Sequence, residues 1–267
     1  MAKGVRAAVE TITPKKAKEL LESQAEMQRP ISPLHVRALS HAIDEGEWDY
    51  NGETIKIDKN GKMLDGQHRC QAVIASGKSI KTLVVYGLEP KVFTTIDQRA
   101  KARGIGDMLR IRGESSTPQL AAALKQLWVY QNGYKKDMRW GELTMNEVYG
   151  FLEQHIEIRD SIVWGGRVKK FVQPAVASMC HYIFANKHEK MADEFFTKLQ
   201  TGENLSERSP ILVLRNRLLW NKLSSKAKLP GKQMIAMFIQ AWNRFREKKP
   251  TKELRGVKSG QKMPRPI

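Results

Sequence analysis

The hydrophobic pattern changes near residue 105, and this change limits the fold more than any other feature. Before that point, stretches with the two-residue alternation of strands lie between stretches with helical spacing. After it the strand pattern fades, and apolar residues recur at helical spacing, as from Met234 to Phe245. The 267 residues are therefore predicted to form an α+β domain with a small mixed sheet, followed by an all-α domain.

Two helix starts in the N-terminal part carry a strong local signal. Thr13-Pro14 and Ser32-Pro33 each combine an N-cap residue with proline at the first helical position. Asn60-Gly61 has the composition of a hairpin turn between two short strands. The predicted elements are helices over 14–23, 33–46 and 66–77 and strands over 54–58, 62–64 and 82–86.

Prolines lie near the starts of most of the later helices, where proline is tolerated. These helices are predicted over 117–131, 144–157, 174–200, 208–225 and 230–247. From Lys248 onward, Pro, Gly and Lys predict an extended tail. The expected organisation is a first domain over 1–112, a helical domain over 113–248 and a basic extended tail over 249–267.

Positive charge is concentrated at the C-terminal end. The formal net charge is +18, and residues 201–267 hold 16 Lys and Arg against four Asp and Glu. One-signed charge of this kind favours a nucleic-acid partner, and solvated helix faces with a basic tail are the alternative. The candidate nucleic-acid-binding residues are Lys101, Arg103, Arg244, Arg246, Lys248, Lys249, Lys252 and Arg255.

Several classes of protein are excluded by composition. No apolar run approaches about 18 residues, so we expect no transmembrane helix and no membrane partner. Cys70 and Cys180 are the only cysteines, which excludes a disulfide scaffold and favours a reducing cytoplasm. The histidines lack metal-ligand spacing, so we expect no zinc site. The sequence also shows no Walker loop and no local Ser/His/Asp arrangement.

The segment from Leu64 to Ala72 carries the most chemical information. It lies between a hairpin strand and a short helix, and a strand, a glycine turn and a helix N-terminus together form an anion site. Gly66 allows close approach to a phosphate, while Gln67, His68 and Arg69 add side-chain donors. We expect the guanidinium of Arg69 to face the ligand, so that its loss hardly changes stability. A strand-turn-helix with surface polar residues is the alternative.

The segment Asp65-Gly66-Gln67-His68-Arg69-Cys70-Gln71-Ala72 resembles the phosphate-binding motif of the ParB/sulfiredoxin-like fold. The resemblance covers residues 10–110, and Ile96-Asp97-Gln98-Arg99 falls where ParB proteins have their second nucleotide-contacting motif. Two positions depart from the family pattern. Gln67 replaces the cysteine that sulfiredoxins need, and His68 stands where ParB proteins have arginine. Sulfiredoxin chemistry is therefore not expected.

The resemblance implies a nucleotide, ATP or CTP with Mg²⁺, whose phosphates lie over Gly66–Arg69 and whose base and ribose lie nearer residues 97–103. Asp65 is expected either to hold Mg²⁺ or to cap the helix, and Asp97 either to act in catalysis or to form a salt bridge. The expected nucleotide-binding residues are Gly66, Gln67, His68, Arg69, Gln98 and Arg99. The candidate catalytic residues are Asp65, His68 and Asp97.

The favoured function is that of a nucleotide-binding, DNA-associated ParB-like protein encoded by a phage or other mobile element, acting in the bacterial host cytoplasm. Nucleotide binding or slow hydrolysis would then modulate its binding to duplex DNA. One alternative is a metal-dependent nuclease, or a phosphotransferase acting on a small molecule or modified base. The other is a non-enzymatic inhibitor that binds nucleic acid or a host protein. The sequence leaves open whether the chain forms a homodimer.

Overall fold

The structure is a computed structural model, and it describes residues 4–25, 30–96, 103–135, 139–224, 228–258 and 260–267. The chain divides into two compact units. The first comprises Met1–Ala102 with Arg139–Val148, and the second comprises Arg103–Met138 with Tyr149–Ile267.

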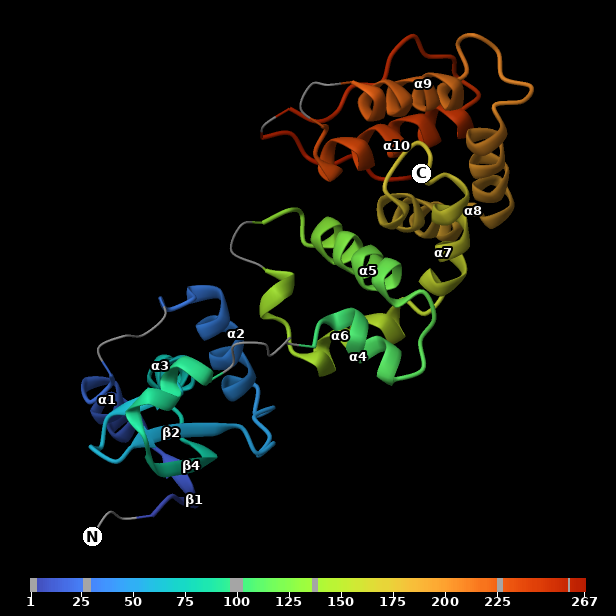
Figure 1. Ribbon diagram of the computed structural model, residues 1–267. Helices are drawn as coiled ribbons and strands as arrows, with labels where there is room; N and C mark the ends of the chain where they lie inside the picture. Colours follow the sequence, from blue (N-terminus) through green and yellow to red (C-terminus); the bar gives the residue numbers. More distant parts are fainter. Residues whose placement is uncertain (1–3, 26–29, 97–102, 136–138, 225–227, 259) are drawn as a thin grey trace. The chain divides into compact units, whose positions relative to one another are not determined.

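The first unit is built on one small mixed sheet (Figure 1). Its central strand β4 pairs antiparallel with β1 on one side and parallel with β2 on the other, and the short β3 pairs antiparallel with β2. Strand β4 is longer than the predicted strand over 82–86, because its pairing with β1 begins at Ile80 and its pairing with β2 reaches Leu88. The four strands are β1 (Arg6–Ile12), β2 (Thr54–Asp58), β3 (Met63–Asp65) and β4 (Ile80–Leu88).

The α-helices described beside this sheet are α1 (Pro14–Glu22), α2 (Pro33–Asp44) and α3 (Gln67–Ser76), and a 3-10 helix follows β4 over Pro90–Thr95. The predicted caps of α1 and α2 are confirmed, since Thr13 Oγ1 accepts from Lys16 N at 3.2 Å and Ser32 Oγ accepts from His35 N at 3.4 Å. The predicted helix over 66–77 is also confirmed, and it begins directly after Gly66.

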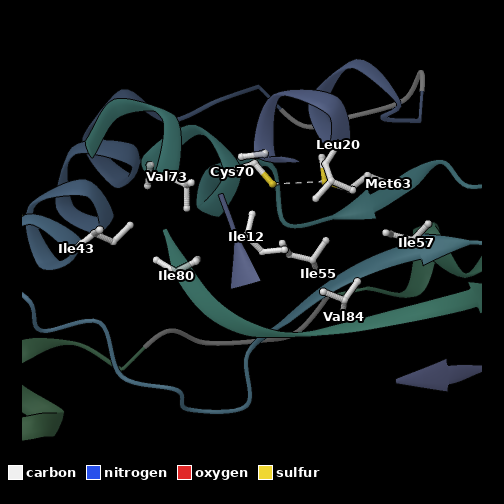
Figure 2. Packing of buried hydrophobic residues seen from close by; sticks show 12 residues of the cluster. Ile12, Leu20, Ile43, Ile55, Ile57, Met63, Cys70, Val73, Ile80 and Val84 are labelled. Carbon is white, nitrogen blue, oxygen red and sulfur yellow. Dashed lines mark hydrogen bonds between the residues drawn. The ribbon is translucent and has the colours of Figure 1, made fainter. Parts of the chain in front are cut away.

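The core of the first unit lies between the sheet and its helices (Figure 2). Ile12, Ile55 and Val84 contribute from the strands and are fully buried, as is Val73 from α3. Cys70 also faces inward, as predicted, and its Sγ lies 3.9 Å from the sulfur of Met63. Each such aliphatic side chain contributes about 1.5–3 kcal/mol by leaving water. Helix α3 is therefore held on the sheet mainly by this apolar face.

A segment distant in sequence completes the first unit. The short 3-10 helix Trp140–Glu142 packs beside α2, where Arg37 Nε pairs with Glu142 Oε1 at 2.5 Å. His41 Nε2 lies 2.9 Å from Glu147 Oε2 on the same helix face. These contacts place residues 139–148 with the sheet unit, although the sequence pattern assigned them to the helical domain.

The rest of the chain is helical, and no strand occurs among the described residues after Arg103. The predicted helices are confirmed with small differences at their ends, except that the helix predicted over 174–200 is kinked at His188, where the backbone is not helical. Helices α4 and α7 are additional. None of the helices that the structure describes is long and apolar enough to cross a membrane. The helices are α4 (Ile105–Ile111), α5 (Thr117–Gln131), α6 (Met145–Gln154), α7 (Ile158–Arg167), α8 (Pro174–Thr201), α9 (Pro210–Leu223) and α10 (Gly231–Arg246).

Aromatic side chains form the core of the second unit. Phe184 of α8 stacks on Trp242 of α10 with ring centroids 4.6 Å apart, and Phe195 meets the edge of the same indole at 5.9 Å. All three side chains are fully buried. Aromatic contacts of this kind add about 0.5–1.5 kcal/mol to the area that they bury. They explain the helical stripe that the sequence shows in α10.

The described residues of the C-terminal segment 249–267 are extended, as predicted, but they are also part of the fold. Leu254 and Val257 are buried, and Gln233 Nε2 donates to Val257 O at 2.7 Å. Farther along, Trp242 Nε1 donates to Ile267 O at 3.2 Å. The packing of this segment depends on two apolar side chains and on backbone carbonyls. The basic composition of the segment therefore did not predict it.

Candidate functional site

The turn between β3 and α3 requires glycine for two independent reasons. Gly66 has φ +116°, in the left-handed region that side chains rarely adopt. A Cβ at this position would also lie 2.8 Å from Ile55 Cγ1 in the buried core. The glycine therefore allows α3 to begin directly against the sheet, as the strand-turn-helix pattern predicts.

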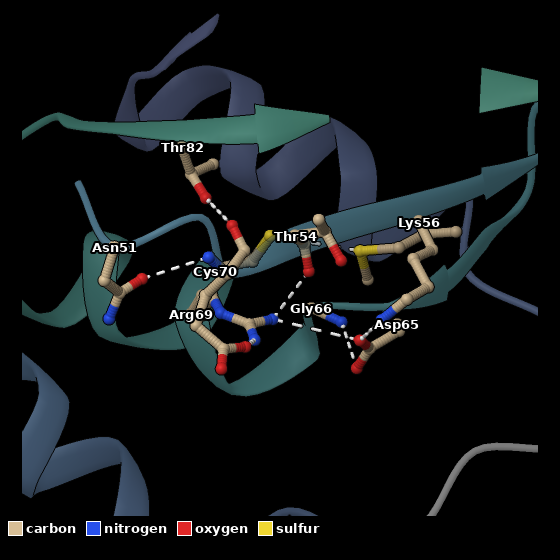
Figure 3. A network of polar contacts seen from close by, with 10 residues as sticks. Asn51, Thr54, Lys56, Asp65, Gly66, Arg69, Cys70 and Thr82 are labelled. Carbon is tan, nitrogen blue, oxygen red and sulfur yellow. Dashed lines mark hydrogen bonds and ion pairs between the residues drawn. The ribbon is translucent and has the colours of Figure 1, made fainter. Parts of the chain in front are cut away.

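The side chain of Arg69 faces β2 rather than open solvent (Figure 3). Its Nη1 donates to Thr54 O at 2.9 Å, and its Nη2 pairs with the carboxylate of Glu53. Asp65 Oδ2 lies 4.0 Å from Nη1. The side chain is 16% exposed, so this guanidinium has a structural task, which differs from the expectation that it faces a ligand. It links the third residue of α3 to the start of β2.

Both carboxylate oxygens of Asp65 have partners. Lys56 Nζ donates to Oδ2 at 2.6 Å, and Gly66 N donates to Oδ1 at 2.8 Å. Asp65 thus stabilises the turn, but it does not cap α3, whose N-cap is Gly66 and which has no side-chain cap hydrogen bond. The predicted Mg²⁺ role of Asp65 stays a prediction. Among the residues that the structure describes, no three His, Cys, Asp or Glu groups are arranged to hold a metal ion.

His68 joins the beginnings of two helices. The side chains of Gln67 and His68 lie inside the fold, and the residues are 4% and 7% exposed. His68 Nε2 accepts a hydrogen bond from Ser32 N, the N-cap residue of α2, at 3.0 Å. The ring of His35, in the first turn of α2, meets the His68 ring edge-on at 5.0 Å. The N-termini of α2 and α3 therefore converge at this point.

This convergence creates a region of positive potential. The first turns of α2 and α3 both lack acidic residues, so the positive ends of their dipoles are not offset from within the helices. One carboxylate does reach the α3 end, since Asp65 Oδ1 accepts from Gly66 N. Ser32 and His35 are exposed, so the α2 end of this region is open to solvent, whereas residues 66–68 at the α3 end are buried. A phosphate is the kind of group that such helix ends bind.

The second predicted nucleotide-contacting segment, near residues 97–103, lies almost wholly outside the described residues. Asp97, Gln98, Arg99 and Lys101 lie outside the described residues. Arg103 is exposed, belongs to the second unit and precedes the N-cap Gly104 of α4. The roles predicted for these residues stay predictions.

The C-terminal cations fall into two groups. Arg244, Lys248 and Lys252 are exposed and form no ion pair with any described residue. By contrast, Lys249 pairs with Glu247 at 3.2 Å, Arg255 pairs with Glu253, and Arg246 donates to Ile267 O at 2.8 Å. Among the predicted nucleic-acid-binding residues, the first group therefore has positive charge available to a partner, whereas the charge of the second group is already engaged within the protein.

A Ser/His/Asp contact chain, which the sequence did not reveal, connects α7 to α8. Ser161 Oγ lies 2.9 Å from His181 Nδ1, and His181 Nε2 lies 3.0 Å from Asp193 Oδ1. Burial lowers the pKa of His181, although Asp193 acts in the opposite direction. Ser161 is only 2% exposed and Trp164 stacks on the imidazole at 4.9 Å, so a substrate has no approach to the hydroxyl. The chain is a packing feature, and its members are too far apart in sequence to form a motif.

No family description fits the sequence, and no curated protein is detectably similar to it.

We predict that Arg69→Ala lowers the free energy of unfolding of the first unit by about 2 kcal/mol, because it removes charge-assisted hydrogen bonds to Thr54 O and Glu53. The stability of Arg69→Lys should lie between those of the wild type and Arg69→Ala, since lysine keeps the charge but lacks the planar guanidinium that can donate to two acceptors at once. Urea denaturation of the full chain measures both. Equal stability of Arg69→Ala and the wild type would contradict the structural role.

We also predict that both thiols are unreactive in the folded protein. Burial raises the pKa of Cys70 to about 12 and raises that of Cys180. Since the thiolate is the nucleophile, neither cysteine should react with a thiol reagent at pH 8 until denaturant is added. Fast modification of Cys70 in the native state would contradict this result and reopen thiol chemistry at the motif.

Proposed function

We propose that this chain is a nucleotide-binding, DNA-associated protein whose first unit is ParB/sulfiredoxin-like. The observation that carries the proposal is the meeting of the α2 and α3 N-termini at the hydrogen bond from Ser32 N to His68 Nε2. The resemblance of Asp65–Ala72 to the family's phosphate-binding motif favours a ligand at the same end of α3. Both lines favour a phosphate group as the ligand, and ATP or CTP as the molecule that carries it.

Within this proposal the motif side chains shape the site more than they contact the ligand. Gly66 sets the start of α3, His68 holds α2 against it, and Arg69 fixes α3 on β2. The ligand would be bound chiefly by the two helix ends. Mg²⁺ would arrive with the nucleotide phosphates rather than on Asp65, whose oxygens are already engaged. These contacts favour binding over a metal-dependent nuclease at this turn.

Glu53 offers a second reason for considering an anion here. Its carboxylate is 62% exposed and pairs with Arg69, so the guanidinium already binds one anionic group. Because the Glu53 carboxylate is the exposed member of this pair, a phosphate could take its place on Arg69. Arg69 can then contribute one charge-assisted hydrogen bond to the ligand while Thr54 O keeps it in position.

The DNA-associated part of the proposal is supported by the charge of the C-terminal end. Residues 201–267 have a large excess of cations. Arg244, Lys248 and Lys252 are exposed without a described ion partner, so their charge is available to phosphates. Such contacts would provide affinity and orientation on duplex DNA without sequence specificity.

The nucleotide site can be tested by placing a negative charge between the two helix ends. We predict that His35→Glu weakens ATP or CTP binding by about tenfold, whereas the neutral control His35→Gln has less effect. Glutamate is favourable in the first turn of a helix, so α2 should still fold, which circular dichroism can check. Isothermal titration calorimetry gives the affinities. Equal affinity of His35→Glu and His35→Gln would contradict a phosphate at this point.

The DNA contacts can be tested by salt dependence. We predict that replacing Arg244, Lys248 and Lys252 with glutamine flattens the slope of log K against log salt for a duplex by about 2–3 units, since each phosphate contact contributes about 0.9. The matched control replaces Lys249 and Arg255, whose charges are already offset by Glu247 and Glu253. Unchanged slopes in both variants would contradict DNA binding by this end of the chain.

A further inference from the structure

The second unit contains a cavity lined by cations. Its volume is about 800 Å³, and it lies between the end of α5, the middle of α8, the start of α10 and the C-terminal segment. Cavities that bind small molecules typically measure about 300–1,000 Å³. Four basic side chains line this one, with no carboxylate among its described lining residues: Lys187, Lys232, Lys262 and Arg265.

The wall of this cavity is fixed by hydrogen bonds and is not a free tail. Tyr130 Oη donates to Pro264 O at 3.2 Å, and Asn243 Nδ2 donates to Arg265 O at 2.9 Å. Asn243 Oδ1 also accepts from Ile267 N at 3.2 Å. The segment that carries Lys262 and Arg265 is thus held against both α5 and α10.

The charge of the cavity is not neutralised within the protein. None of its four cations forms an ion pair with a residue that the structure describes. Lys232 Nζ instead lies 5.0 Å from the ring centroid of Tyr134, a contact that positions the ammonium without cancelling its charge. Helix α5 ends and helix α10 begins here, so their dipoles act in opposite directions. The positive potential therefore comes from the side chains.

We infer that this cavity binds a small molecule carrying several phosphate groups, at a site separate from the Gly66 turn. Four cations around one cavity suit a compact polyanion, and three of them, Lys187, Lys262 and Arg265, are exposed and can be reached from solvent. A duplex would need its cations spread along a longer face. The ring of Tyr130 lines the same cavity and offers an apolar surface to the organic part of the ligand. The inference rests on the cavity alone and does not need the proposed nucleotide site of the first unit.

The test measures binding of ATP, CTP and inorganic tripolyphosphate to the full chain by calorimetry. The cavity variant combines Lys232→Gln with Lys262→Gln. The matched control combines Lys125→Gln with Lys190→Gln, which removes two exposed cations of α5 and α8 outside the cavity. We expect the cavity variant to lose about tenfold or more in affinity for at least one probe, because charge-assisted contacts are lost. The control should stay within about twofold.

The outcomes separate this inference from the proposed function. Loss of affinity in the cavity variant with retention in His35→Glu supports the cavity site and contradicts the site at the helix ends. The reverse result overturns the cavity site and supports the other. Tripolyphosphate binding as tightly as ATP identifies phosphate as the group recognised, and binding of the nucleotides alone shows that the nucleoside is also contacted. Failure of all three probes, or binding only of a single-stranded oligonucleotide through these lysines, overturns the inference.

Discussion

The packing of α3 on the sheet is the constraint on which the rest of the first unit depends: the apolar face of the helix holds it there, and the contact of Arg69 with β2 fixes its first turn. The guanidinium hydrogen bonds to Thr54 O and pairs with Glu53, so the first turn of α3 is fixed at the beginning of the strand. At the preceding turn, Gly66 lies so close to Ile55 that no side chain fits between them. Together they set the position and direction of α3, and the positive end of that helix follows from them.

The position of α3 in turn determines where α2 begins. His68 is the second residue of α3, and its imidazole reaches the backbone N–H of the α2 cap. Two helix ends thereby share one small region, and neither carries an acid in its first turn. A motif whose side chains are mostly turned inward can still define an anion site, because the backbone of the helix ends remains the binding element.

Local signals in the sequence predicted the elements well. Caps such as Thr13 and Ser32 act within one turn, so their effect is visible without tertiary context. The direction of Arg69 was not predictable, because the motif supplies donors and only the fold decides whether they meet a ligand or a strand. The packing of Val257 and of residues 139–148 was also missed, since it depends on partners far away in the chain.

The central claim is that a phosphate binds where α2 and α3 begin, and backbone amide spectra test it most directly. We would record ¹H–¹⁵N spectra of the full chain during titration with ATP and with CTP. The account predicts that, with at least one of them, the amides of Ser32, Gly66, Gln67 and His68 shift together and saturate. If all four amides stay unchanged while a nucleotide saturates the protein elsewhere, the account is contradicted.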